Sequence, residues 1–308
     1  MIDVEACTDG YNEDWKVRLR DKLSEIVASR QCSDEVYTYI GYCYQCYAPA
    51  FLYKYYSDAK PYNFEAVKNN AMWYSSAINF NDVFDCDIFV DEDAIFKSIV
   101  DASPAIKGLK KGSPLWREYK SQSIKSTQGL RKSFNELKSK TGISCLSELD
   151  DSLLMWAHYA NNHKGFCVEY ELMEINKQLQ FTPIPIIYSN EKVFVGSLFP
   201  QSLEKSVTKM IVDSLSTKST EWSYEKEWRI IRDDSACGDK WNSEKLGALL
   251  PMISPTSIIL GCESTSSFQT IVEQYCRENK INLYKMEKDN HLYKLNKKVL
   301  LSFDTQDI

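Results

Sequence analysis

Two glutamates separated by one residue, Glu225 and Glu227, are the most informative chemical groups in the sequence. They lie in the segment 222–232, where aromatic and charged residues alternate. On a β-strand alternate side chains share a face, so Glu225, Glu227 and Arg229 would project together. Two such carboxylates repel, and Arg229 offsets the repulsion by pairing with one of them. A rigid pair of this kind can bind ribose hydroxyls and stabilise positive charge at an anomeric carbon. The alternative is an exposed, salt-bridged strand face.

His158 and His163 form a second candidate group. A helical zinc pair needs two histidines four residues apart, as in H-E-x-x-H. These two are five apart, about 140° around a helix, so we do not expect a two-histidine metal site. His158 by itself is either a base or ligand-orienting group, or a hydrogen-bonded structural histidine.

Short polar side chains gather after residues 71–76, at Asn79, Asn81, Asp82 and Asp85, where they hold either a turn or a ligand. Cys43 and Cys46 form a CxxC, but a structural zinc site needs four ligands and no second pair follows. There is no glycine-rich phosphate loop and no G-x-S-x-G nucleophile motif.

Hydrophobic periodicity predicts the elements that position these groups. We expect strands at 71–76, 143–147, 166–171, 183–189, 222–232 and 256–261. We expect helices at 12–30, from Ser33 onward, at 91–103, at 151–162 and at 199–218. Gly165 should end the helix over 151–162, and a strand–helix–strand unit should close the chain.

The predicted architecture is one mixed α+β domain over residues 51–308, preceded by a helical N-terminal extension over 1–50. No internal repeat or linker interrupts it. No run of residues is apolar and long enough to span a bilayer, so we expect no membrane partner. Ten cysteines without an export signal indicate reduced thiols in a cytoplasmic protein.

The charge of the chain is unevenly distributed. The 308 residues carry a net charge of −6, which by itself does not indicate nucleic-acid binding. Between Pro104 and Lys140, however, ten Lys and Arg stand against two Glu, a net of +8. We expect this segment to be a helical insertion that docks an acidic target, nucleic acid or protein. The alternative is a solvated helix pair.

Four segments together resemble the bacterial family known as domain of unknown function 2971. They are 52–55 (LYKY), 73–85 (WYSS to FNDVFD), 143–160 (ISCLS to MWAHYA) and 224–229 (YEKEWR). The resemblance covers about residues 50–300. Where that family has proline in its polar turn, this sequence has Val83.

The order of elements in that family is similar to the ADP-ribosyltransferase fold, a split α+β sandwich that binds NAD in a cleft. The resemblance implies that Glu227 takes the catalytic place, with Glu225 and His158 as further catalytic candidates. It also implies NAD as a substrate, with Lys54 standing where that fold has arginine or histidine. Lysine pairs with a pyrophosphate as a point charge. The implied cofactor-binding residues are Lys54, Tyr55, Tyr74, Ser75, Asn81, Asp82 and Arg229.

Three hypotheses follow. The first is an ADP-ribosyltransferase-like enzyme, in which Tyr74 stacks on the nicotinamide ring, with a toxin or phage-defence effector as its setting. The second is a nuclease or nucleotide hydrolase, in which Glu225, Glu227, Asp82 and His158 converge on a divalent metal. The third is a non-catalytic sensor that binds nucleic acid or protein through residues 104–140.

Overall fold

A computed structural model describes residues 14–29, 34–179, 183–196 and 203–303, which form two compact units. Unit 1 comprises residues 1–48, 84–136 and 186–219, and unit 2 comprises 49–83, 137–185 and 220–308. Both are mixtures of helices and strands, and the predicted α+β class is confirmed. The predicted N-terminal extension contributes α1 and α2 to unit 1, and most of the basic segment belongs to the same unit.

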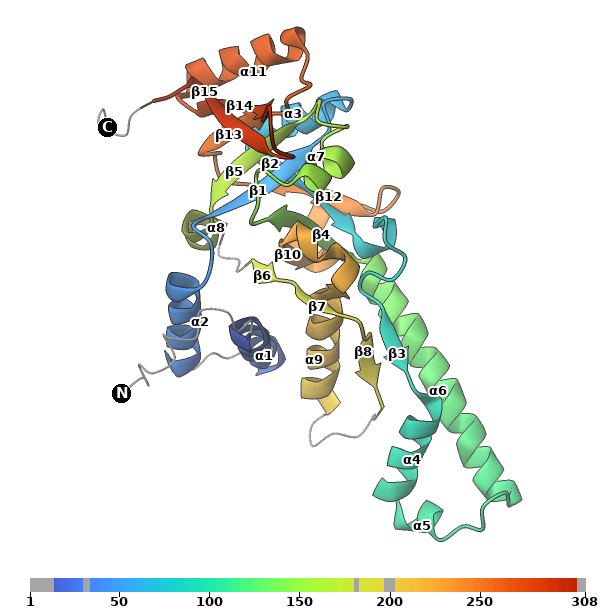
Figure 1. The fold of residues 1–308 in the computed structure, drawn as a ribbon. Helices are drawn as coiled ribbons and strands as arrows, with labels where there is room; N and C mark the ends of the chain where they lie inside the picture. Colours follow the sequence, from blue (N-terminus) through green and yellow to red (C-terminus); the bar gives the residue numbers. More distant parts are fainter. Residues whose placement is uncertain (1–13, 30–33, 180–182, 197–202, 304–308) are drawn as a thin grey trace. The chain divides into compact units, whose positions relative to one another are not determined.

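Unit 2 contains a large mixed sheet (Figure 1). Its main path runs β11-β12-β2-β4-β1-β5-β13-β14-β15, while β10 pairs with both β4 and β6. Neighbours are antiparallel except β13 and β14, which are parallel because α11 connects them. The strands are β1 Phe51–Tyr56, β2 Ala71–Ser76, β4 Thr141–Ser147, β5 Phe166–Glu171, β6 Ile184–Pro185, β10 Glu227–Asp233, β11 Trp241–Asn242, β12 Gly247–Pro251, β13 Ser257–Leu260, β14 Asn282–Lys288 and β15 Leu295–Leu301.

The helices of unit 2 begin where local capping favours them. The Ser152 hydroxyl accepts from the backbone N–H of Met155 at the start of α7, and Pro61 occupies the first turn of α3. Trp156 of α7 is fully buried and packs edge-on against Tyr55 of β1, which fixes α7 on the sheet. The helical segments are α3 Pro61–Lys68, η2 Ala77–Asn79, α7 Leu153–Tyr159, α8 Leu172–Leu179, η3 Thr220–Glu225, α10 Asp234–Cys237, η4 Gly238–Lys240 and α11 Ser266–Asn279.

Helix α7 is shorter than the predicted 151–162. Asn161, Asn162 and His163 all have positive φ, a left-handed conformation that ends the helix before Gly165. Gly165 is required for close approach instead, because a Cβ there would lie 2.1 Å from the carbonyl oxygen of Tyr56. The turn is therefore set by the packing of 160–165 against β1.

Unit 1 consists mainly of helices with two small parallel strand pairs, β3 with β8 and β7 with β9. Residues 14–29 and 34–46 form helices as predicted. The sequence analysis identified neither β3 nor β8, which are three residues long. The elements are α1 Asp14–Ser29, α2 Asp34–Cys46, β3 Ile88–Val90, α4 Glu92–Ala102, α5 Pro104–Lys107, α6 Pro114–Ser139, β7 Ile187–Ser189, β8 Val193–Val195, α9 Leu203–Leu215 and β9 Thr217–Ser219.

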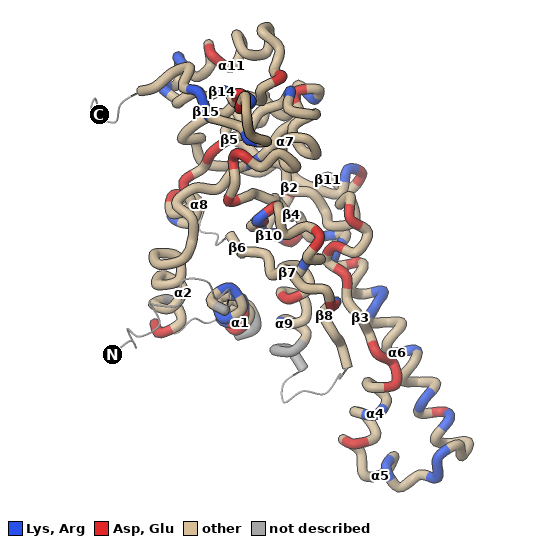
Figure 2. The backbone as a smooth tube through the Cα atoms, viewed as in Figure 1, with Lys and Arg blue, Asp and Glu red and all other residues tan. Residues whose placement is uncertain are grey.

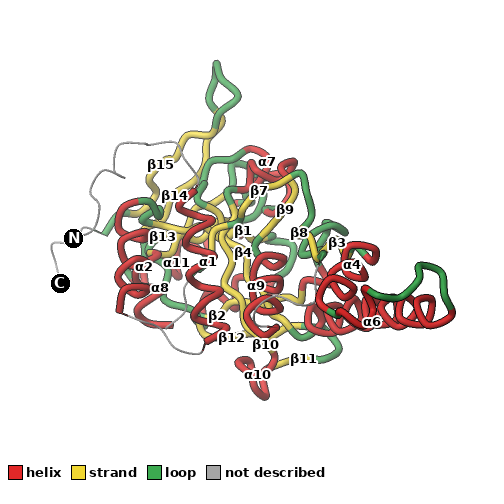
Figure 3. Tube along the Cα trace, turned by 90° about the horizontal axis from the view of Figure 1, so that it is seen from below, coloured by secondary structure: helices red, strands yellow, loops and turns green. Residues whose placement is uncertain are grey.

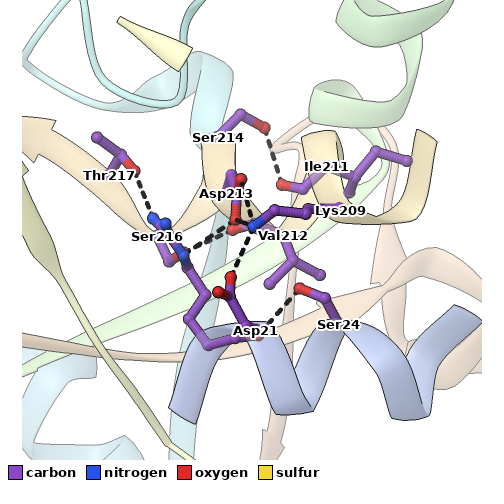
Figure 4. A network of polar contacts seen from close by, with 10 residues as sticks. Asp21, Ser24, Lys209, Ile211, Val212, Asp213, Ser214, Ser216 and Thr217 are labelled. Atoms are coloured by element: carbon purple, nitrogen blue, oxygen red, sulfur yellow. Dashed lines mark hydrogen bonds and ion pairs between the residues drawn. The ribbon is translucent and has the colours of Figure 1, made fainter. Parts of the chain in front are cut away.

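Helices α1 and α9 lie side by side (Figures 1 and 3) and are joined by charged contacts (Figure 4). Lys209 donates to Asp21 at 2.6 Å and forms an ion pair with Asp213 at 3.0 Å. Arg20 pairs with Asp213 at 2.9 Å and donates to the hydroxyl of Thr217 at 3.1 Å. This network ties the N-terminal helix to a segment that lies almost two hundred residues away in sequence.

The long helix α6 is anchored in unit 1 through one face. Its Leu130 packs against a cluster of Val90, Ile95 and Val195, and Trp116 meets Phe96 edge-on at 5.2 Å. None of the described helices is both long and apolar enough to cross a membrane. The described cysteines are all free, and Cys43 and Cys46 lie on α2, the first buried and the second exposed.

Candidate functional site

The sheet of unit 2 splits at β4. One edge of β4 pairs with β10 along its whole length, from Thr141 to Ser147. On the other edge β1 pairs only at Ser147 and β2 only at Gly142 and Ile143. The described register thus leaves residues 144–146 without a strand partner on that edge, so β1 and β2 diverge around the middle of β4.

Lys54 of β1 extends into this split. Backbone groups on one edge of an antiparallel strand recur every second residue, so the Cys145 carbonyl points the same way as those of Ile143 and Ser147, into the gap. The Lys54 Nζ donates to that carbonyl at 2.7 Å and to the Ser144 hydroxyl at 3.3 Å. The amine thus satisfies a backbone acceptor that no strand reaches.

The charge state of Lys54 reflects its surroundings. Burial lowers the pKa of Lys54, while Cys145 and the Glu227 carboxylate oppose that shift. Burial also raises the pKa of the Cys145 thiol well above its ordinary value, and Glu227 adds to the effect. Cys145 is therefore a neutral thiol at neutral pH, and Lys54 lies within electrostatic range of Glu227.

Glu227 and Arg229 of β10 form a buried, two-pronged ion pair. The Nε of Arg229 donates to Glu227 Oε1 at 2.7 Å, and Nη2 donates to Oε2 at 3.2 Å. Both side chains are almost completely buried, and the guanidinium also lies 5.4 Å from the ring centroid of Phe80. A buried carboxylate needs such a partner, and the two bonds fix the plane of the Glu227 carboxyl.

Glu225 is held by a different element. Residues 220–225 form the short helix η3, and Lys226 has a φ of +44°, so the strand begins at Glu227. The predicted strand over 222–232 is therefore wrong in its first five residues, because the left-handed turn at Lys226 interrupts the alternation. Glu225 is nevertheless buried, and its Oε1 accepts from the Tyr159 hydroxyl at 2.6 Å. Its backbone carbonyl accepts from the Ser147 hydroxyl, also at 2.6 Å.

Helix α7 brings His158 to the same neighbourhood. His158 is exposed, and its Nδ1 lies 3.1 Å from the hydroxyl of Tyr224, the residue before Glu225. The next residue of α7, Tyr159, holds the carboxylate of Glu225 itself. Helix α7 therefore contacts η3 at two adjacent residues: His158 lies against Tyr224, and Tyr159 holds Glu225.

Strand register separates the remaining candidates of β1 and β2. Ser75 pairs with Ile143 and so faces the same side of the sheet as Glu227, whereas Tyr74 faces the other side. Tyr74 is completely buried, with its ring packed under the guanidinium of Arg232, so no ring face is open for stacking. Tyr55 is also buried, and its hydroxyl donates to a backbone carbonyl.

Asn81 and Asp82 follow η2 in the turn that also carries Phe80. Asn81 is exposed and Asp82 is half-buried, while Phe80 contacts Arg229. The turn is thus connected to the buried pair through an aromatic side chain that the sequence analysis did not single out. Within the described residues, no group of three or more His, Cys, Asp or Glu side chains is arranged to hold a metal ion.

The structure therefore brings together Glu225, Glu227 and Arg229, with His158 one contact further out. Strand register places Lys54 on the opposite face of the sheet from Glu227, although the two remain within electrostatic range through the split. The sequence analysis missed the residues that hold these groups, namely Ser144, Cys145, Ser147 and Tyr159. The available sequence signal was the presence of Ser144 and Ser147 in a mainly apolar strand. Their hydroxyls are buried, and buried hydroxyls need hydrogen-bond partners.

Comparison with known proteins gives a family and no activity. A family model described as "Protein of unknown function (DUF2971)" matches residues 155–230, a segment that includes α7 and most of β10. This match supports, over these residues, the family resemblance that the sequence motifs indicated. No curated protein and no solved structure matches the chain.

Proposed function

We propose that this protein is an ADP-ribosyltransferase-like enzyme that uses NAD as its substrate. The match of residues 155–230 to the DUF2971 family model supports the proposal, because the order of elements in that family is similar to the ADP-ribosyltransferase fold. The observation that carries the proposal is the split at β4. An amine at the gap and a fixed carboxylate on β10, along the other edge of β4, lie within electrostatic range of each other. An NAD-cleaving site needs one such group for the pyrophosphate and one for the ribose.

The proposed reaction breaks the bond between nicotinamide and the ribose C1′. The bonding electrons go to the nicotinamide ring nitrogen, and C1′ develops positive charge. Glu227 stabilises that charge and accepts a hydrogen bond from a ribose hydroxyl. Because Arg229 fixes the carboxyl plane, little reorganisation is needed when the charge develops.

Glu225 completes the transfer. The acceptor nucleophile forms its bond to C1′, and its proton passes to Glu225, the carboxylate that Tyr159 orients. Lys54 pairs with the pyrophosphate, and its lowered pKa is restored when an anion binds beside it. His158, next to Tyr224, contacts the acceptor. Tyr74 is completely buried, so it packs in the core and does not stack on the nicotinamide ring.

The family resemblance also motivates the proposed setting, a cytoplasmic toxin or phage-defence effector. Its acceptor or target is an acidic macromolecule that docks on the basic segment 104–140. The alternative is a metal-dependent hydrolase. Among the described residues, no cluster of metal ligands favours it.

Labelled NAD tests the activity. The protein is incubated with NAD labelled in the adenine ring and with protein and nucleic-acid acceptors, with and without EDTA. We expect label on an acceptor and free nicotinamide in equal amounts, both insensitive to EDTA. Turnover that EDTA abolishes would contradict the transferase and favour the hydrolase.

A further inference from the structure

The cations of helix α6 share one face. At about 100° per residue they fall within an arc of about 140°, whereas Glu118 and Glu136 lie outside it. Figure 2 shows the basic residues recurring along this helix. The basic face comprises Arg117, Lys120, Lys125, Arg131, Lys132 and Lys138.

Most of this charge is not neutralised within the protein. Lys120 pairs with Asp93 at 3.0 Å, and Arg131 donates to a backbone carbonyl. Arg117, Lys125 and Lys132 are exposed, and within the described ranges they have neither an ion pair nor a hydrogen bond from their side chains. The same holds for the three lysines of the preceding segment, Lys107, Lys110 and Lys111.

Among the exposed lysines of unit 2, some are paired, whereas others, such as Lys60, Lys240 and Lys245, have no ion pair within the described ranges. Lys288 pairs with Glu263, and Lys298 pairs with Glu287 at 2.7 Å. The chain has 43 acidic and 37 basic residues, so carboxylates are abundant. A helix face on which most cations have no carboxylate partner presents a local positive field, and such a field attracts a polyanion.

A shallow hollow of about 430 Å³ lies along the same face. Arg117, Lys120 and Lys125 line it together with Ser121 and Gln128. Charged side chains accompanied by hydroxyl and amide groups are the donors that contact phosphate oxygens in protein–DNA interfaces.

We infer that the basic face of α6 binds the phosphate backbone of double-stranded DNA. The 26-residue helix is about 39 Å long, close to one turn of the duplex. Single-strand binding relies on stacking aromatics, whereas the one aromatic ring at the hollow, Trp116, is already packed against Phe96. The inference rests on the acidic target in the proposed function and is independent of the chemistry at Glu227.

Fluorescence anisotropy of a labelled 20-base-pair duplex, titrated with the full chain at several salt concentrations, tests this inference. The variant carries Arg117→Gln, Lys125→Gln and Lys132→Gln. Each lost phosphate contact should lower the slope of log Kd against log salt by about 0.9, so the triple variant should lose about 3. A matched control carries Lys60→Gln, Lys240→Gln and Lys245→Gln, which make the same change in net charge on unit 2.

Loss of binding in the α6 variant but not in the control supports the inference. It is overturned if the wild type does not bind the duplex, if both triple variants lose the same slope, or if polyglutamate competes as well as DNA. Glu227→Gln should bind the duplex like wild type. An enzyme that binds DNA through α6 but never releases nicotinamide would therefore refute the transferase alone.

Discussion

Breaking the buried pair of Glu227 and Arg229 is the sharpest structural perturbation available. In Arg229→Met both hydrogen bonds to the carboxylate are lost, and Glu227 remains buried with the guanidinium removed. Removing one partner of a buried ion pair costs about 3–5 kcal/mol. Domains are stable by about 5–15 kcal/mol, so the variant should lose a large part of its stability.

Urea unfolding followed by circular dichroism measures this loss, and a double-mutant cycle assigns it. The double variant Glu227→Leu/Arg229→Met leaves no charge behind, so it should be more stable than Arg229→Met alone. Arg277→Met is the control, because its pair with Glu273 is exposed and contributes about 0–1 kcal/mol. A loss below about 1 kcal/mol in Arg229→Met, or a double variant as unstable as the single one, would refute the reasoning.

Three further variants or conditions test other parts of the structure. Ser147→Ala should lose about 1–3 kcal/mol in the same urea assay, since the carbonyl of Glu225 then lacks its 2.6 Å donor; an unchanged midpoint would show that this bond is unimportant. Gly261→Ala should lower the melting temperature by several degrees, because the new Cβ would lie 2.0 Å from the His163 carbonyl oxygen, and a wild-type melting curve would contradict that crowding. Burial raises the pKa of Tyr74 to about 12, so its stabilising contribution is complete below pH 10 and is lost as pH rises from 10 to 12. Absorbance at 295 nm should show one phenol fewer ionising near pH 12 in Tyr74→Phe than in the wild type, and identical titrations would contradict this assignment.

Local signals in the sequence predicted many elements well. The strand expected at 71–76 and the helix expected at 91–103 correspond to β2 and α4, whose ends agree with those expectations within a residue or two. In each case the signal lies within the element itself.

The elements that were missed depend on partners distant in sequence. The short strands β3 and β8 exist because they pair with each other across about a hundred residues. The left-handed turn at Lys226 divides a segment that alternates like a strand, and no residue type in it marks the break.

In the candidate site, too, local contacts were predicted from the sequence and contacts between distant strands were not. The pairing of Glu227 with Arg229 follows from their spacing on a strand, and it was predicted as the way to offset repulsion between the carboxylates. That both side chains are buried, and that Lys54 spans a split at Cys145, depends on which strands flank β4. Sequence periodicity carries no information about that arrangement.

Nicotinamide release from NAD by the wild type and by Glu227→Gln tests the proposed function most directly. Glu278→Gln, on the exposed side of α11, is the control, and circular dichroism verifies that each variant is folded. We expect the wild type and Glu278→Gln to release nicotinamide at the same rate and folded Glu227→Gln to be at least about 100-fold slower. Equal rates in all three proteins, or no release by the wild type with any acceptor, would contradict the proposed function.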